Sequence, residues 1–204
     1  MKKKTLTLLT ILSGLLLLGC YPKGAEYAED LDVVITKSND QYDFSAKSTY
    51  AMPDSIVAVT GNLIEGELPE FIPNVYAGPM LDRIASNMAD MGYTRVGVDE
   101  NPDLILRPAA WETTTVYYYY DYWYWWYGGY YPYWGYYPPV YYSSYSTGTL
   151  FWTLADPDEI SADGKPIIQW SAAINGLLTY TYDLNRANKG IDQAFTQSPY
   201  LLTK

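Results

Sequence analysis

The amino-acid sequence predicts an α+β fold: a mostly antiparallel sheet with two helices on one face and a long aromatic insertion between two strands. Short segments in which apolar and polar residues alternate, the pattern of half-buried strands, recur along the chain. Two longer segments instead repeat apolar residues every three or four positions, as helices do. Strands and helices in this order favour a sheet with its helices on one face, and no internal repeat suggests another architecture.

The first 19 residues predict an export signal. Three lysines at positions 2–4 form a basic start, and a mostly apolar run follows over residues 6–18. This run is shorter than the roughly 20 residues that a membrane-spanning helix needs, but it has the length of the apolar region of a signal peptide. It ends in Leu17-Leu18-Gly19-Cys20, which resembles the lipobox of bacterial lipoproteins. The resemblance implies cleavage after Gly19 and acylation of Cys20, whereas the alternative is an ordinary secretory peptide with an accidental cysteine.

Acylation of Cys20 makes a membrane the first predicted partner. Two acyl chains anchor a protein stably, since each buried methylene contributes about 0.8 kcal/mol. Tyr21 stands where an aspartate would signal retention in the inner membrane in enteric-type sorting, so the outer membrane is the expected location. Acidic residues close behind the cysteine loosely resemble surface-export signals, which leaves both faces of that membrane open: Glu26, Glu29, Asp30 and Asp32.

Charge and cysteine content exclude several classes of function. Without the three signal lysines, the chain keeps 10 Lys and Arg against 23 Asp and Glu. Phosphate-rich polymers repel such a surface, so nucleic acid is not an expected partner. Cys20 is the only cysteine, so the mature protein has no free thiol for a disulfide, a metal or a nucleophile.

After a polar tether over residues 20–30, residues 31–204 predict one domain, because about 185 mature residues suffice to bury a core. Residues 53–74 contain three prolines and are expected to form a loop. An acidic loop with an Asp163-Gly164 turn is expected to join the last two strands. The expected strands are 31–36, 48–52, 94–98, 103–111, 147–155 and 166–174.

Two helices are expected. Pro79 fits the first turn of the first helix, and Gly92 fits the position just after its end. Pro199 stops the second helix just beyond its last apolar residue. The apolar residues at helical spacing are Met80, Leu81, Ile84, Met88 and Met91 in the first helix and Leu184, Ala187, Ile191, Ala194 and Phe195 in the second.

Several short motifs, in this order and spacing, resemble a bacterial lipoprotein family known as domain of unknown function 4136. The motifs are Tyr42-Asp43-Phe44-Ser45, Thr49-Tyr50, Gly92-Tyr93, Pro102-Asp103-Leu104, Gly148-Thr149-Leu150, Trp170, Ile191-Asp192-Gln193-Ala194-Phe195 and Ser198-Pro199-Tyr200. The resemblance covers roughly residues 31–202 and implies an envelope lipoprotein with an α+β domain. It brings no catalytic residues. It also implies that members of the family often carry aromatic sequence between these two strands, and the insertion in this chain is an extreme case.

The insertion, residues 117–145, is the most unusual part of the chain. Nineteen of its 29 residues are Tyr or Trp, and Asp121 is its only charge. Prolines, glycines and phenol groups exclude a membrane span, and Gly128-Gly129 fits a hairpin turn. Such rings bind sugars, lipid headgroups or proteins, but they also cover a protein's own sheet. The candidate binding residues are Trp123, Trp125, Trp126 and Trp134.

The sequence offers no catalytic constellation and no implied cofactor. It contains no histidine, and no serine lies in a G-x-S-x-G motif. The acidic segment 156–159 fails the calcium-loop template, so a solvated loop is preferred over an irregular calcium site. Arg107 and Glu112 differ in strand parity and are expected to be surface charges rather than an active pair. Trp152 and Trp170 are expected in the core or on a sheet face.

The sequence therefore predicts a non-enzymatic envelope lipoprotein whose aromatic segment contacts an envelope protein or a glycan. The alternative is a structural or assembly lipoprotein whose aromatic segment only covers its own sheet. A hydrolase that uses acidic residues is the third and least favoured hypothesis.

Overall fold

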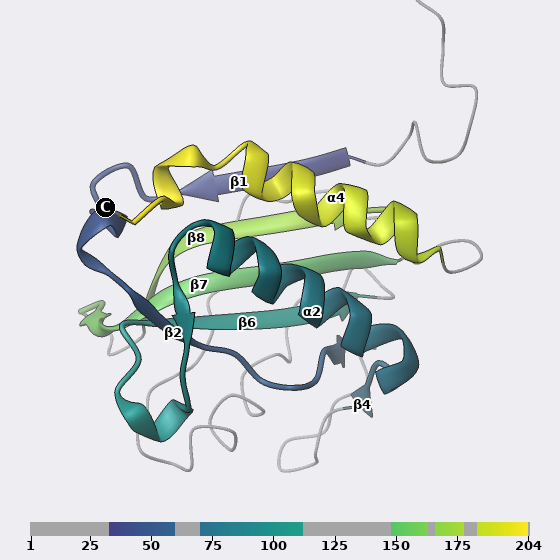
Figure 1. The fold of residues 1–204 in the computed structure, drawn as a ribbon, viewed down its shortest axis with the longest axis horizontal. Coiled ribbons are helices and arrows are strands. Elements are labelled where there is room, and N and C mark those ends of the chain that lie inside the picture. The colour runs from purple at the N-terminus through teal and green to yellow at the C-terminus, as the bar shows by residue number, and fades with distance from the viewer. Residues whose placement is uncertain (1–32, 60–69, 112–147, 163–165, 178–182, 204) are drawn as a thin grey trace, which may run out of the picture. The chain divides into compact units, whose positions relative to one another are not determined.

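A computed structural model describes residues 33–59, 70–111, 148–162, 166–177 and 183–203 of the chain (Figure 1). All of them belong to one compact unit, Asp32–Lys204. The predicted signal peptide (1–19) and tether (20–30) lie outside the described residues. Among the described helices, none combines the length and the apolar character that crossing a membrane requires.

One sheet organises this unit. Its main strands lie in the order β1-β8-β7-β6-β2-β5. Strand β3 pairs with β6 on the same edge as β2, and β4 pairs with β3. The strands are β1 (Val33–Ser38), β2 (Thr49–Ala51), β3 (Val57–Val59), β4 (Glu70–Phe71), β5 (Thr94–Arg95), β6 (Leu104–Trp111), β7 (Thr149–Ile160) and β8 (Pro166–Asn175). The helical elements are η2 (Phe44–Ala46), α2 (Asn74–Asp90), η3 (Val98–Glu100), α4 (Leu184–Thr196) and η4 (Pro199–Leu201).

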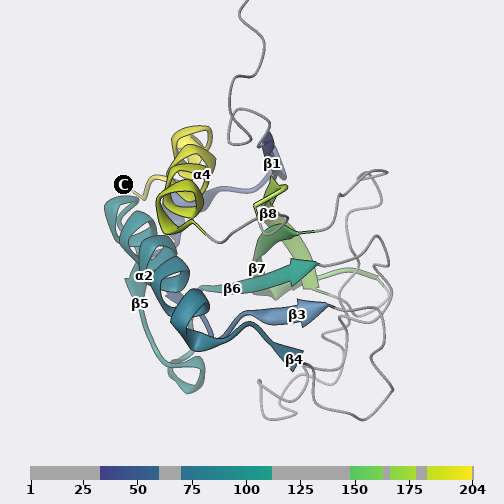
Figure 2. The same cartoon turned by 90° about the vertical axis from the view of Figure 1, so that its right-hand side faces the viewer.

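The four longest strands, β1, β8, β7 and β6, are all antiparallel to their neighbours. The short strands β2 and β3 instead run parallel to successive halves of β6. Both helices lie on the same side of this sheet (Figure 2). The predicted α+β class, with a mostly antiparallel sheet and two helices on one face, is therefore confirmed, and the parallel pairs are a feature that the sequence pattern did not reveal.

The core lies between the sheet and the two helices. Trp152 on β7 and Trp170 on β8 meet edge to face with ring centroids 6.0 Å apart, and Phe195 of α4 lies 5.4 Å from Trp170. Both tryptophans are fully buried, as predicted. The indole N–H of Trp170 donates to the hydroxyl of Ser198 at 2.9 Å, which attaches the end of α4 to the sheet.

Helix α2 begins one turn before the predicted start. Pro79 lies inside the helix, which starts at Asn74. The predicted end is correct: Gly92 has a φ of 97°, and the N–H of Tyr93 donates to the carbonyl of Met88. A Cβ at Gly92 would lie 2.1 Å from the Thr203 hydroxyl, so glycine is required there both for its backbone conformation and for space.

Two of the expected loops contain strand. Within 53–74, Val57–Val59 pairs with β6, and Glu70–Phe71 pairs with β3. The acidic segment after residue 155 is not a solvated loop, because β7 continues through it to Ile160. Asp156, expected in that loop, is buried, with 2% of its surface exposed.

Candidate interaction site

The sheet has a second buried face. Side chains along a strand alternate between its two faces, and the residues of β6, β7 and β8 that pack on the helices are the even-numbered ones. Odd-numbered neighbours of these residues point away from α2 and α4, and nine of them, each at most 2% exposed, form a continuous set. We call this set the second sheet face: Ile105, Arg107, Ala109, Thr149, Phe151, Thr153, Ala155, Ser171 and Ala173.

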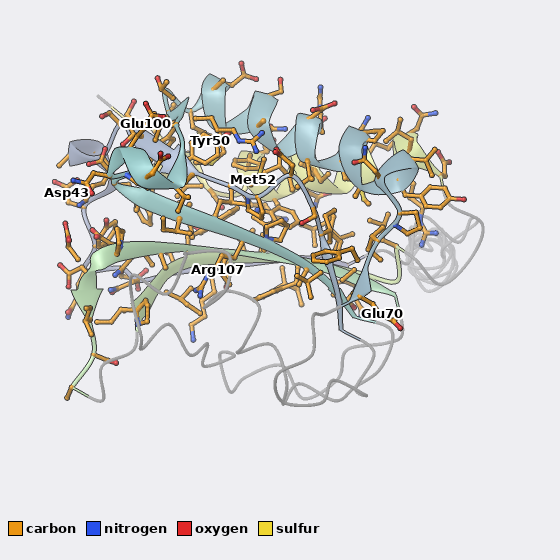
Figure 3. The ribbon with its side chains drawn as sticks, turned by 90° about the horizontal axis from the view of Figure 1, so that it is seen from below. Asp43, Tyr50, Met52, Glu70, Glu100 and Arg107 are labelled. Atoms are coloured by element: carbon orange, nitrogen blue, oxygen red, sulfur yellow. The ribbon has the colours of Figure 1, made fainter. Side chains whose placement is uncertain are left out.

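Figure 3 shows the two faces in one view. Arg107 lies on the side of β6 away from α2, whereas Tyr50 and Met52 lie between the strands and the helix. Arg107 is 1% exposed, so the expectation that it is a surface charge is wrong. The alternation of the strand indicated which face it occupies but not whether that face is covered. Glu112, the other half of the rejected pair, lies outside the described residues.

A polar row crosses the middle of the second sheet face. Arg107 on β6 is paired with Thr153 on β7, which is paired with Ser171 on β8. Lys37 on β1 extends the row to the edge of the sheet, where its side chain is exposed. In the part of the chain that the structure describes, the buried hydroxyl of Thr153 has no hydrogen-bond partner.

Apolar rows flank the polar one. On one side, Ala109, Phe151 and Ala173 are paired in sequence across β6, β7 and β8. On the other side, Ile105 is paired with Ala155. Apart from Phe151, Ile105 and Arg107, the side chains of this face are small, and the cationic group of Arg107 belongs to its middle row. A guanidinium buried there is costly unless acceptors or ring faces surround it.

A second cluster of polar groups lies around Asp156. The hydroxyl of Tyr42 donates to Asp156 Oδ2 at 2.5 Å, and Lys47 Nζ lies 2.7 Å from the same oxygen. The N–H of Asp158 donates to Asp156 Oδ1 at 2.9 Å. Tyr42 also packs edge to face on Phe44, with ring centroids 4.8 Å apart. These contacts fasten the segment between β1 and β2 to the middle of β7.

The pKa values of this cluster follow from its geometry. Burial alone would raise the pKa of Asp156, but its bonds from Lys47, Tyr42 and the Asp158 amide lower that pKa below its ordinary value. Burial lowers the pKa of Lys47, yet the adjacent carboxylate outweighs this and raises it. Burial and the bond to Asp156 raise the pKa of the Tyr42 phenol. The cluster is therefore held as an ion pair with a neutral phenol, which suits a structural link better than proton transfer at neutral pH.

The acidic segment does not gather metal ligands. Asp156 is turned inward to Lys47, whereas Asp158 and Glu159 are exposed. Among the residues that the structure describes, no group of three metal-binding side chains comes together. Asp163, which the calcium hypothesis also used, lies outside them.

The site residues predicted from the sequence lie outside the described residues. These are the lipidation site Cys20 and the candidate binding residues Trp123, Trp125, Trp126 and Trp134. Sequence reasoning missed the polar row and the Asp156 cluster. One signal for the row was present: Arg107 interrupts a segment, Leu104–Ala110, that is otherwise apolar.

The comparisons with known proteins agree on the fold. The family model of the domain of unknown function DUF4136 matches residues 34–200. A crystal structure of a DUF4136 family protein from Bacteroides thetaiotaomicron is 26% identical, with a TM-score of 0.62, and the match covers 85% of this chain and 98% of that one. No curated protein matches the chain.

Two further solved structures show weaker likeness. A PelC dodecamer from Paraburkholderia phytofirmans is 12% identical, with a TM-score of 0.41 and coverage of 85% and 99% of the two chains. A PDZ domain protein from Parabacteroides distasonis is 15% identical, with a TM-score of 0.43 and coverage of 85% and 37%. Neither likeness is close enough to inform function. The match to the family model over nearly the whole described unit is decisive: this chain belongs to the DUF4136 family, a family of unknown function.

Proposed function

We propose that this protein is a non-enzymatic cell-envelope lipoprotein, anchored through Cys20 in the outer membrane, that binds an envelope protein or a glycan through residues 117–145. The observation that carries the proposal is where this segment is attached. Trp111 at the end of β6 is paired with Thr149 at the start of β7. The insertion therefore leaves the sheet from β6 and re-enters it on β7 at adjacent positions. These two paired strands form a rigid base for a binding segment.

The composition of the segment supports recognition. It holds 15 of the 24 tyrosines and four of the seven tryptophans. Tyr and Trp offer large, stiff faces with one polar group each, so they bind sugars and proteins at a low cost in conformational entropy. This concentration in 29 residues exceeds what a connection between two paired strands needs.

The absence of enzyme activity is also part of the proposal. The sequence has no histidine, and its one cysteine is the predicted acylation site. Of the described acidic side chains, Asp54, Asp156 and Asp192 are each paired with a Lys or Arg side chain. Carboxylates held in this way contribute to the fold and are poorly placed to act as general acids or bases.

The binding proposal is tested with the four tryptophans of the segment. Replacing Trp123, Trp125, Trp126 and Trp134 by alanine should weaken binding at least 30-fold, since a binding hot spot contributes roughly 2 kcal/mol or more. A matched variant with phenylalanine at the same positions should keep most of the affinity. Glycan arrays with the purified mature chain, and cross-linking in intact cells, provide the readouts. Absence of any glycan bound and of any specific cross-linked protein would reject recognition.

A scaffold function is the second candidate, and the second sheet face favours it. That face is buried although α2 and α4 lie on the other side of the sheet. If residues 117–145 serve only to cover it, the four tryptophans should be shielded from acrylamide without any partner. Recognition instead requires that at least some of them be quenched in the free protein and become shielded when a ligand binds.

A further inference from the structure

We propose that the domain lies on the membrane with the end at which β1 begins facing the lipid, and that Phe71, Val75 and Tyr76 contact the lipid headgroups there. This inference rests on the proposed acylation of Cys20 and adds to it the orientation of the domain on the membrane. The contact surface consists of described side chains, and its partner is a lipid bilayer rather than another protein.

The strand register defines this end of the domain. Val33, the first residue of β1, is paired with Asn175 at the end of β8. The hydroxyl of Thr149 at the start of β7 donates to the side-chain oxygen of Asn175 at 3.1 Å. Thr149 is paired with Trp111 at the end of β6, which is paired with Val59. We call the end marked by this row of five residues the β1 end, and the chain from the proposed lipid anchor enters the domain there.

Exposed apolar side chains lie at the β1 end. Val75 is 70% exposed, and Phe71 and Tyr76 are 42% and 41% exposed. Phe71 is paired with Val57, two positions before Val59 of the row. Val75 and Tyr76 belong to the first turn of α2, which starts at the same end of the domain as β1 (Figure 1). An aromatic ring with a hydroxyl, beside apolar groups, is a combination that membrane interfaces favour.

The exposed carboxylates gather at the opposite end. Figure 3 shows Asp43 and Glu100 at that end, whereas Glu70 lies at the β1 end. We call it the acidic end, and its exposed acidic residues are Asp40, Asp43, Asp90, Asp99, Glu100, Asp158 and Glu159. The described acidic residues at the β1 end are Glu70 and Asp183, the residue that caps the start of α4. Anionic headgroups repel the acidic end, so electrostatics favours the orientation in which the β1 end faces the lipid.

The acidic end also carries exposed apolar residues, namely Ile160, Tyr200 and Leu202. Ile160 directly follows Glu159, and Tyr200 packs on Phe44, which directly follows Asp43. Insertion of these side chains into a bilayer would bring the neighbouring carboxylates to the headgroups. Tyr200 and Leu202 therefore serve as matched controls for the residues at the β1 end.

The connection to Cys20 allows this orientation without a strong contact. The chain from Cys20 to Val33 spans at most roughly 45 Å when extended. Five strand spacings, or about 24 Å, separate β1 from β4 across the sheet. A short connection of this kind gives the β1 end a millimolar effective concentration at the lipid. A few partly exposed side chains therefore suffice to hold one orientation.

The test compares two tyrosines of nearly equal exposure, 41% for Tyr76 and 42% for Tyr200. Replacing either one by p-benzoylphenylalanine places a photoreactive ring at the β1 end or at the acidic end. The mature protein isolated from cells is reconstituted into vesicles of phosphatidylethanolamine and phosphatidylglycerol and irradiated. Lipid adducts at position 76 should exceed those at position 200 by about tenfold or more. Equal yields at the two positions, or a higher yield at position 200, would overturn the inference.

A pair of charged variants tests the contact surface itself. Val75→Asp places a carboxylate at the β1 end, and Leu202→Asp places one at the acidic end. Both positions are exposed, so neither change should lower the melting temperature. With p-benzoylphenylalanine at position 76, Val75→Asp should lower the lipid adducts several-fold, because a carboxylate resists transfer into the interface. Leu202→Asp should leave them unchanged, and an equal yield in the two variants would overturn the inference.

An artificial anchor separates this inference from the proposed function. A chain that starts at Cys20 and is made without the signal peptide keeps Cys20 as its only thiol, which couples to a maleimide-bearing lipid in the same vesicles. The excess of adducts at position 76 should appear in this coupled chain as well. Absence of natural acylation would reject the lipoprotein proposal and leave this measurement intact. Equal yields at positions 76 and 200 in the coupled chain would overturn the orientation and leave the acylation of Cys20 untouched.

Discussion

Asp156→Asn is the most informative single substitution in the described part of the chain. The change keeps the size of the side chain and removes its charge. It leaves the Tyr42 hydroxyl with a neutral acceptor in place of the carboxylate 2.5 Å away. It also leaves the Lys47 ammonium, whose side chain is 23% exposed, without its counter-charge.

The expected loss of stability is about 2–3 kcal/mol. Breaking a fully buried ion pair costs about 3–5 kcal/mol, but Lys47 is partly exposed and can turn toward water, which reduces the cost. The weaker hydrogen bond from Tyr42 to a neutral acceptor accounts for about 1 kcal/mol of this loss of stability. For a domain of this size, the melting temperature should fall by about 5–10 °C.

Thermal and urea unfolding of the mature chain measure this loss. Asp158→Asn is the matched control, because it removes the same charge from an exposed side chain only two residues away. It should change stability by no more than about 0.5 kcal/mol. A double-mutant cycle of Asp156→Asn with Lys47→Met would then report the interaction between the two side chains.

The pH dependence provides an independent check with a defined sign. The pKa of Asp156 is lowered in the folded state, so its contribution is present above the ordinary aspartate pKa of about 3.9 and is lost as pH falls through the folded-state value. The stability difference between the wild type and Asp156→Asn should therefore shrink below about pH 4. Equal stability of Asp156→Asn and Asp158→Asn at pH 7 would refute the structural reading of this cluster.

Two further predictions concern the anchor and the end of α2. Cys20→Ala should abolish incorporation of a clickable fatty acid and leave the unprocessed precursor, and equal labelling of wild type and variant would end the lipoprotein proposal. Gly92→Ala should destabilise the domain by at least about 1–2 kcal/mol, because its φ is 97° and the new Cβ would lie 2.1 Å from the Thr203 hydroxyl. Gly78→Ala, inside α2 with 3.4 Å to the nearest side-chain atom, should be neutral or stabilising in the same unfolding assay.

The elements that could be predicted from the sequence are those whose signal is local. Helix α4 and the end of α2 follow from apolar spacing and from one glycine. The long strand β6 follows from its apolar composition and from the Asp103 that precedes it. In the structure, that carboxylate accepts the backbone N–H groups of Ser48 and Thr49, which fixes β2 beside β6.

The features that escaped prediction depend on distant partners. Strands β3 and β4 contain three and two residues, too few for a periodic pattern, and they exist because β6 supplies a parallel edge. The acidic neighbours of Asp156 dominate the local composition and predict a solvated loop there. Its burial requires Tyr42, 114 positions earlier in the chain, and no local pattern indicates that contact.

The two faces of the sheet differ in the size of many of their side chains. On the helix side, β7 and β8 carry Trp152 and Trp170, whose large rings fill much of the space beneath the helices. On the other side, β7 carries the large Phe151, but the same strands also carry Thr153 and Ser171, which fill little of the space above them. Close packing requires that large groups come from whatever covers such a surface.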